Sequence, residues 1–265
     1  MKVDPKKCVG CGNCVPVCTM GAIHVNGVAE VNEDECVECG TCRRFLRIEG
    51  LNPTFVRLVR AVLAAFRLQY RAPLDVCPTG ALYQPDLTWP RIVRKSFSDP
   101  TTVHAETGIG GRGTEEIKTN DVTGRLGPGE VGIVVELGRP GLGVRFKELQ
   151  RFSMALAEIG AVFEKNNPVT HLMTDPNTGQ LKEDVLEEKV YSAIIEMKTT
   201  VERVPEFLSV INRVGKSSPT VFGIAISAKC GPNGEIPYIE AVAEAGYELS
   251  LNGKTNLGLG RRANP

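Results

Sequence analysis

The chain has 265 residues, which suits one or two domains with a proper buried core. Its 31 basic and 31 acidic residues balance, so the net charge gives no reason to expect a nucleic acid or an anionic membrane surface as partner. The N-terminus has no apolar signal region, and the longest apolar runs, such as residues 61–66, are far too short to cross a bilayer. The sequence therefore predicts no membrane insertion.

Eight of the nine cysteines lie in the first 77 residues, as two short runs followed by one single cysteine. The first run is Cys8, Cys11, Cys14 and Cys18, and the second is Cys36, Cys39 and Cys42, completed by Cys77. C-x2-C-x2-C-x3-C is the spacing of bacterial [4Fe–4S] sites, in which the fourth cysteine ligates the other cluster. The spacing thus predicts two [4Fe–4S] clusters: one is held by Cys8, Cys11, Cys14 and Cys77, and the other by Cys36, Cys39, Cys42 and Cys18.

Three other cysteine chemistries fit the pattern less well. Zinc sites usually show two pairs of cysteines rather than two triplets with remote fourth members. Disulfides need an oxidising compartment, and nothing in the sequence indicates export. Thioredoxin-like C-x-x-C motifs do not occur as overlapping triplets.

An internal repeat accompanies the two triplets. Residues 17–23 (VCTMGAI) match residues 76–82 (VCPTGAL), which indicates a duplicated half. On these motifs residues 1–90 resemble the bacterial two-cluster ferredoxins, and the resemblance implies two halves around a pseudo-twofold axis with the clusters in electron-transfer range. The chain departs from that family at Thr19, which replaces a usual proline, and in an insertion between Cys42 and Cys77.

The segment between the first four cysteines and the second triplet predicts a hairpin. Residues 21–32 alternate about Asn26-Gly27, which is a strong turn signal. His24 lies in this hairpin, and we interpret it as a surface strand side chain rather than as a residue that tunes or ligates a cluster.

The insertion, residues 43–72, predicts a helix over residues 53–70, with Pro53 in its first turn. Apolar residues recur there at helical spacing and arginines line the other faces; the apolar residues are Phe55, Leu58, Val59, Val62, Leu63 and Phe66, and the arginines are Arg57, Arg60, Arg67 and Arg71. Two interpretations stay open. The helix is either a lid whose apolar stripe covers a cluster or packs on a second domain, or a basic docking face for an acidic redox partner.

Residues 91–129 are polar and rich in Gly, Pro and Thr, which predicts a linker or a functional loop. Residues 108–113 satisfy G-x-G-x-x-G, but a dinucleotide site needs a buried strand before this motif and a helix after it. The residues before it do not form an apolar strand pattern. A bound flavin therefore has no supporting motif.

Residues 130–265 predict an α/β domain without clusters. Strands are expected at 131–137, 161–164, 191–198, 220–227 and 247–251. One helix is expected to follow the turn at 138–143 and to end near residue 159, and two more are expected at 205–214 and 238–245. This β-α-β…β-α-β order favours a ferredoxin-like α/β plait, so the predicted fold class is α+β: a two-cluster module with a helical insertion, followed by that plait. We interpret the loop 138–143 as a tight turn rather than an anion site, and the lone Cys230 as a packing or loop residue.

A second resemblance spans most of the chain. Residues 112–125 (RGTEEIKTNDVTGR) and 135–141 (VELGRPG) look like iron–sulfur proteins named 6-hydroxynicotinate reductases. The resemblance implies reduction of a hydroxylated pyridine ring in anaerobic metabolism, with electrons from reduced ferredoxin. It assigns no catalytic residue to this sequence.

These observations lead to one functional hypothesis and one alternative. The first is electron transfer through two [4Fe–4S] clusters in a reducing cytoplasm, as the iron–sulfur subunit or carrier that feeds an anaerobic reductase or other oxidoreductase through a protein partner. The alternative is an enzyme that itself reduces a heteroaromatic acid, which would need a flavin or a catalytic subunit. The sequence leaves open whether the chain binds a small-molecule substrate.

Overall fold

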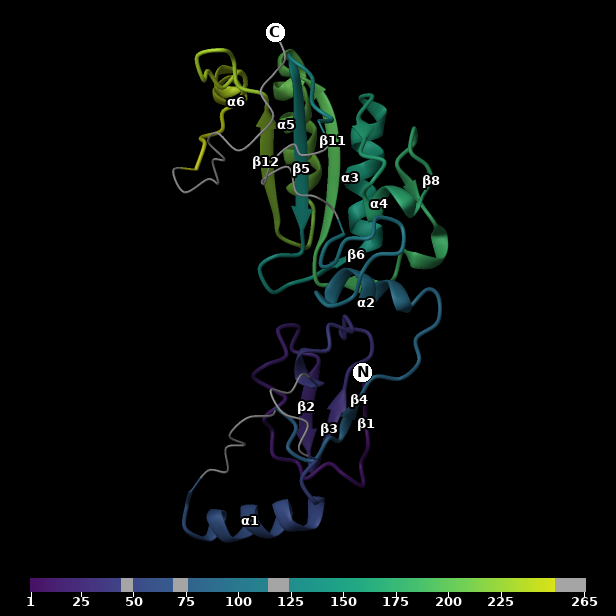
Figure 1. Ribbon diagram of the computed structural model, residues 1–265, viewed down its shortest axis with the longest axis vertical. Coiled ribbons are helices and arrows are strands. Elements are labelled where there is room, and N and C mark those ends of the chain that lie inside the picture. Colours follow the sequence, from purple (N-terminus) through teal and green to yellow (C-terminus); the bar gives the residue numbers. More distant parts are fainter. Residues whose placement is uncertain (44–49, 69–75, 114–123, 251–265) are drawn as a thin grey trace.

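The computed structural model describes residues 1–43, 50–68, 76–113 and 124–250. An N-terminal module lies at one end of the molecule and a larger α/β region at the other, with α2 (Ile92–Ser98) between them (Figure 1). None of the helices in these described ranges combines the length and apolar character that a bilayer crossing requires.

The N-terminal module is built on two small strand pairs that join its duplicated halves. Strand β1 (Lys2–Val3) pairs with β4 (Leu82–Tyr83), and β2 (Ile23–Asn26) pairs with β3 (Val28–Val31), both antiparallel. Each pair therefore joins the start of one half to the end of the other. The predicted hairpin about Asn26-Gly27 is the β2–β3 pair, and Gly27 takes the positive φ (74°) that its turn needs.

The halves repeat each other bond by bond. The Asp4 N–H donates to the Ala81 carbonyl at 2.8 Å, and the Asn32 N–H donates to the Ala22 carbonyl at the same distance. In the first half, the Cys8 N–H donates back to the Asp4 carbonyl at 3.0 Å. In the second half, the Cys36 N–H donates back to the Asn32 carbonyl at the same distance. Each of these cysteines is the first of its triplet. The sequence repeat is thus a structural repeat with a pseudo-twofold relation.

Helix α1 (Pro53–Ala65) lies between Cys42 and Cys77 in the sequence and at the end of the module that is remote from the α/β region (Figure 1). The Asn52 side chain caps it by accepting the N–H groups of Thr54 and Phe55 at 2.9 and 3.4 Å. The helix is shorter than the predicted 53–70, because Arg67 takes a positive φ (57°) and the Leu68 N–H closes on the Leu63 carbonyl at 2.9 Å. This Schellman-type closure ends the helix.

The stripe of α1 does not cover a cluster as the lid interpretation expected. The side chains of Phe55, Leu58, Val62 and Phe66 are each at least half exposed. Val56, which follows Phe55 and lies about 100° round the helix from it, is buried instead. Arg71 of the predicted basic face lies outside the described residues.

Helix α2 corrects the expectation that residues 91–129 are all linker or loop. Val93 and Phe97 are buried and belong to the hydrophobic core of the α/β region. The helix has only seven residues, too few for a helical period to stand out in the sequence.

The α/β region contains a four-stranded antiparallel sheet in the order β12-β5-β11-β7. The strands are β5 (Glu130–Leu137), β7 (Val162–Phe163), β11 (Ala193–Thr200) and β12 (Phe222–Ala228). Helices α3 (Phe146–Glu158) and α5 (Val204–Gly215) connect them in the sequence order β-α-β-β-α-β and pack on one another and on the sheet.

Shorter elements complete this region. The pairs are β6 (Val144–Arg145) with β10 (Lys189–Val190) and β8 (Met173–Asp175) with β9 (Gln180–Leu181); the helices are α4 (Pro168–His171) and α6 (Ile239–Glu244); and the 3-10 turns are Thr41–Arg43, Glu183–Val185 and Val201–Arg203. The strand expected at 247–251 is absent from residues 247–250, which the structure describes as irregular, and residue 251 lies outside the described part.

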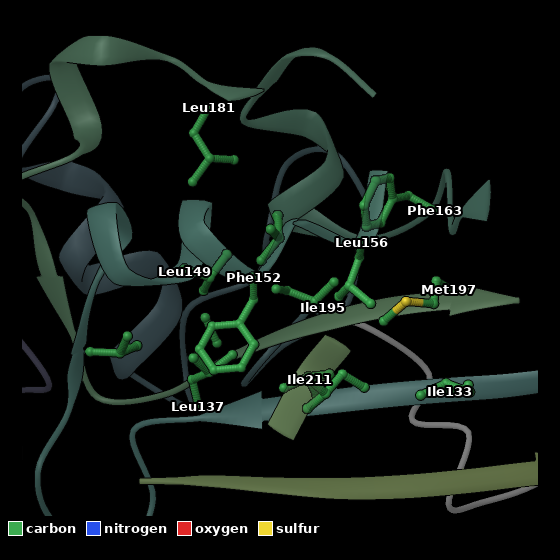
Figure 2. Close-up of a cluster of buried hydrophobic side chains, with 14 of the residues drawn as sticks. Ile133, Leu137, Leu149, Phe152, Leu156, Phe163, Leu181, Ile195, Met197 and Ile211 are labelled. Carbon is green, nitrogen blue, oxygen red and sulfur yellow. The ribbon is translucent and has the colours of Figure 1, made fainter. Parts of the chain in front are cut away.

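The main core lies between the sheet and α3 with α5 (Figure 2). Strands β5 and β11 are aligned so that Val135 faces Ile195 and Ile133 faces Met197. These four side chains belong with Phe152 of α3 to one buried hydrophobic cluster, of which Figure 2 draws Ile133, Ile195, Met197 and Phe152. Burial does not alternate along β5, because residues 131–135 are all buried. Both faces of this strand are therefore covered.

Core packing at α3 can be tested by truncation. Phe152→Ala is expected to lower the free energy of unfolding of the α/β region by about 3–5 kcal/mol, because the ring is 1% exposed and its loss leaves a cavity. Met154→Ala on the same helix is the control: Met154 is 39% exposed, so a change within about 0.5 kcal/mol is expected. Denaturant unfolding followed by circular dichroism measures both, and equal midpoints would contradict this core.

Candidate metal centres

The first cavity of the N-terminal module is lined by the four cysteines that the spacing assigns to one cluster, Cys8, Cys11, Cys14 and Cys77. The space between the first triplet loop, Val25 of β2 and Leu82 of β4 measures about 330 Å³, part of it open to solvent. Three of these cysteines come from the first half of the module and the fourth from the second half. The β1–β4 pair brings them together, because it places Cys77 beside the first triplet loop.

The second cavity has the reciprocal composition. Its cysteines are Cys36, Cys39, Cys42 and Cys18, and its empty volume is about 380 Å³. Met1, Met20 and Val31 supply apolar walls. The structure thus brings the eight side chains together as two sets of four, and their role as ligands is a separate proposal.

Backbone amides already point at several of the sulfurs. The Ala22 N–H donates to Cys18 Sγ at 3.3 Å, and the Ala81 N–H donates to Cys77 Sγ at 3.1 Å. Each alanine follows its cysteine by four residues, so the two bonds occupy equivalent places in the repeat. Donors of this kind stabilise negative charge on sulfur, which is the charge that a ligating thiolate carries.

The two triplet loops need left-handed backbone at equivalent places. Gly10 has φ 59°, and a Cβ there would lie 2.1 Å from the Gly27 carbonyl oxygen. The equivalent residue of the second loop is Glu38, whose φ is 57° although it has a side chain. Non-glycine residues pay a conformational cost in this region, so contacts of the Glu38 side chain must offset it.

Glu38 makes those contacts in a buried network beside the second cavity. Its carboxylate accepts hydrogen bonds from Arg91 Nε and Nη2 at 2.9 and 2.7 Å and from Gln84 Nε2 at 2.9 Å, and it pairs with the Met1 amino group. Burial acts to raise the pKa of Glu38, but these bonds outweigh it and hold the pKa below its ordinary value. The sequence interpretation missed Glu38; the available signal was a charged residue at the position where the first loop has Gly10.

Arg94 of α2 ties the second loop to the α/β region. Its Nη1 donates to the carbonyls of Glu33, Asp34 and Cys36 at 2.9 to 3.0 Å, while its Nε pairs with Glu188. The guanidinium is almost fully buried, so these bonds are shielded from water. No sequence motif pointed to this arginine.

Burial and neighbouring thiols disfavour charge on the innermost cysteines as long as no metal is bound. Desolvation, followed by the nearby cysteines, raises the pKa of Cys14 to about 11 and that of Cys42 to about 12. Desolvation also raises the pKa of Cys11 and of Cys36. A bound cation must therefore displace protons from these thiols.

The geometry does not match a site for one metal ion. In the described ranges, no group of three or more His, Cys, Asp or Glu side chains is arranged to hold a single ion. A four-cysteine zinc site needs all four sulfurs about 2.3 Å from one point. Each set of four cysteines instead surrounds a cavity, as a polynuclear group requires.

Other candidate features of the sequence lie away from the cavities. His24 pairs with Glu30 at 2.9 Å on the exposed side of the β2–β3 hairpin, and Cys230 is exposed in the α/β region. The G-x-G-x-x-G segment at 108–113 follows turns rather than a buried strand. The loop at 138–143 does not present free amides at the start of α3, because the Phe146 and Lys147 N–H groups donate to backbone carbonyls at 3.1 and 2.9 Å.

Comparison with known proteins agrees with the chemistry of the N-terminal cavities. Residues 1–24 match the family model described as the 4Fe-4S binding domain. Two curated relatives, both named ferredoxin-1 and both from Rhodobacter capsulatus, are 50% identical over 40 residues, which cover 15% of this chain and 62% of each relative. No solved structure matches the chain.

Residues 1–24 are therefore similar to 4Fe-4S binding domains, and a stretch of 40 residues is similar to these ferredoxins. The chain spans less than two thirds of their length, and most of this chain lies outside the match. The resemblance to 6-hydroxynicotinate reductases receives no support from these comparisons.

The first loop allows a test with a matched pair of glycines. Gly10→Ala should abolish iron binding in the first cavity, because its Cβ meets the Gly27 carbonyl oxygen at 2.1 Å. Gly12→Ala is the control: it also has a positive φ (79°) but nothing within 4 Å of its Cβ. It should cost only the left-handed strain of about 1–2 kcal/mol and keep its iron. Equal iron contents in the two variants would contradict the close approach of Gly27.

Iron loading should depend on pH. With pKa values of about 11 and about 12, the thiols of Cys14 and Cys42 are protonated at neutral pH before a metal binds. Binding releases these protons, so at limiting iron and sulfide the bound fraction should rise between about pH 6.5 and about pH 8.5. Iron per chain after desalting measures this, and a flat profile would contradict it.

Proposed function

We propose that this protein transfers electrons, one at a time, through two [4Fe–4S] clusters. The first centre is assigned to Cys8, Cys11, Cys14 and Cys77, and the second to Cys36, Cys39, Cys42 and Cys18. The observation that carries the proposal is the pair of cavities, each lined by four cysteines drawn from both halves of the repeat. Bound there, a [4Fe–4S] cluster supplies a one-electron redox centre.

The residues around each cavity suit that task. Four thiolates form a soft donor set, which favours iron–sulfur clusters among biological metal centres. The amide of Ala22 stabilises negative charge on Cys18, and that of Ala81 does the same for Cys77. Apolar walls limit the access of water, and such hydrogen bonds and burial set the potential of a centre.

The division of the chain forms part of the proposal. Residues 1–90 form the two-cluster module, and the helix α1 belongs to an insertion in it (residues 43–72). The region from residue 130 is a ferredoxin-like α/β plait without clusters; its support is the β-α-β-β-α-β order and the strand order β12-β5-β11-β7. The plait serves as a platform that holds the second centre through Arg94 and its partners.

The protein works in this proposal as a carrier or as the iron–sulfur subunit of an oxidoreductase in a reducing cytoplasm. A cluster exchanges electrons but offers neither a proton donor nor a substrate pocket. A catalytic partner protein must therefore supply or consume the electrons. No described feature favours a substrate site within this chain.

Single ligand substitutions test the assignment. The wild-type protein, isolated without oxygen, should contain about eight iron and about eight sulfide per chain, and Cys11→Ser or Cys39→Ser should each reduce both to about four. Cys230→Ser is the control and should leave them unchanged, because Cys230 lies outside both cavities. Thermal unfolding of the α/β region should be the same in all four proteins. A colourless protein, a zinc protein, or undiminished iron in both ligand variants would refute the assignment.

A further inference from the structure

Helices α1 and α2 hold the two triplet loops in the same way, although neither belongs to the sequence repeat. Arg57 of α1 donates through Nη2 to the carbonyl of Cys8 and to that of the residue two positions before it, at 3.0 and 3.2 Å. Arg94 of α2 donates through Nη1 to the carbonyl of Cys36 and to that of the residue two positions before it, at 3.0 and 2.9 Å. The pseudo-twofold relation of the module therefore extends to its two flanking helices.

The outer sides of these helices differ. Val93 and Phe97 of α2 are buried in the core of the α/β region, so a folded domain sits on the second centre. The corresponding helix of the first centre presents Leu58 and Val62, with Phe55 and Phe66, to solvent. These four form one face of α1, at successive spacings of three, four and four residues. We call this face the α1 stripe.

Charge around the two helices differs as well. In the second half, Glu35 forms ion pairs with Lys189 and Arg145 of the α/β region, the latter at 3.6 Å. The equivalent residue of the first half is Lys7, which is exposed. Its ion pair with Asp4 is long, with 3.9 Å between Nζ and Oδ2. Helix α1 contains arginines and no acidic residue. A second copy of the chain docked in the same manner would bring Lys189 onto Lys7, so the position favours a different, acidic occupant.

We propose that the α1 stripe, together with Lys7, is the docking surface for a separate acidic electron-transfer protein, which covers the first centre as the α/β region covers the second. The inference rests on the proposed function and adds the place and chemistry of its partner. An apolar contact centre with a charged rim is the usual composition of a specific interface. One electron passes there between the first centre and the oxidised or reduced redox group of the partner, with no bond made or broken.

The test begins with the soluble proteins of the source cells, freed of this protein and separated on an anion exchanger at neutral pH. The dithionite-reduced protein is mixed with each fraction without oxygen, and its reoxidation is followed by visible absorbance. The activity should lie in the retained, acidic fraction. The responsible protein is then purified, and its dissociation constant for this chain is measured by sedimentation, which does not depend on electron transfer.

Matched variants decide the proposal. Val62→Asp in the α1 stripe and Lys7→Glu should each raise the dissociation constant at least about tenfold, equivalent to about 1.4 kcal/mol. Val162→Asp in β7 is the control, because Val162 is 57% exposed and Val62 is 50% exposed. It should bind like the wild type, and all variants should keep wild-type iron.

Three results would overturn the docking surface: equal affinities for Val62→Asp and Val162→Asp, activity confined to the unretained fraction, or a wild-type dimer that Val62→Asp dissociates. A reduced wild-type protein that no fraction reoxidises would instead contradict the proposed function. The two failures are therefore distinguishable.

Discussion

Exchange of strands between the two halves of the module decides which cysteines meet. Because β1 pairs with β4 and β2 with β3, the end of each half is held beside the start of the other. Cys18 is thereby delivered to the second loop and Cys77 to the first. If each half closed on itself, each would gather four cysteines from one stretch of chain and the halves would have no reason to stay together. Each cavity therefore requires both halves of the module.

The duplicated module is symmetric only in its interior. Arg57 and Arg94 fix equivalent carbonyls, yet the helices that carry them meet unlike surroundings. Helix α2 is continuous with the α/β core, whereas α1 leaves an apolar face in solvent. The two triplet loops therefore have different surroundings, because one contacts a helix buried in the α/β core and the other a helix with an exposed apolar face.

The joint between the module and the α/β region is made of buried charge. Arg94 pairs with Glu188 while it holds the carbonyls of the second loop, and Arg91 meets Glu38 beside the same loop. Buried ion pairs add little net stability, but the loss of one partner leaves an expensive unpaired charge. Their effect here is to specify one arrangement of the second loop relative to the α/β region.

Three features depend on short-range spacing and could be predicted before the fold was known: the cysteine motif, the turn at Asn26-Gly27 and the alternation of sheet strands and helices. Ligand spacing and strand period are local properties, so they are legible without a fold. Only the tertiary structure decided that α2 is a helix in the supposed linker, that Glu38 is anchored by Arg91, and that the α1 stripe faces solvent. These depend on partners more than 50 positions away or on the absence of a covering element among the residues that the structure describes, and no local pattern encodes either.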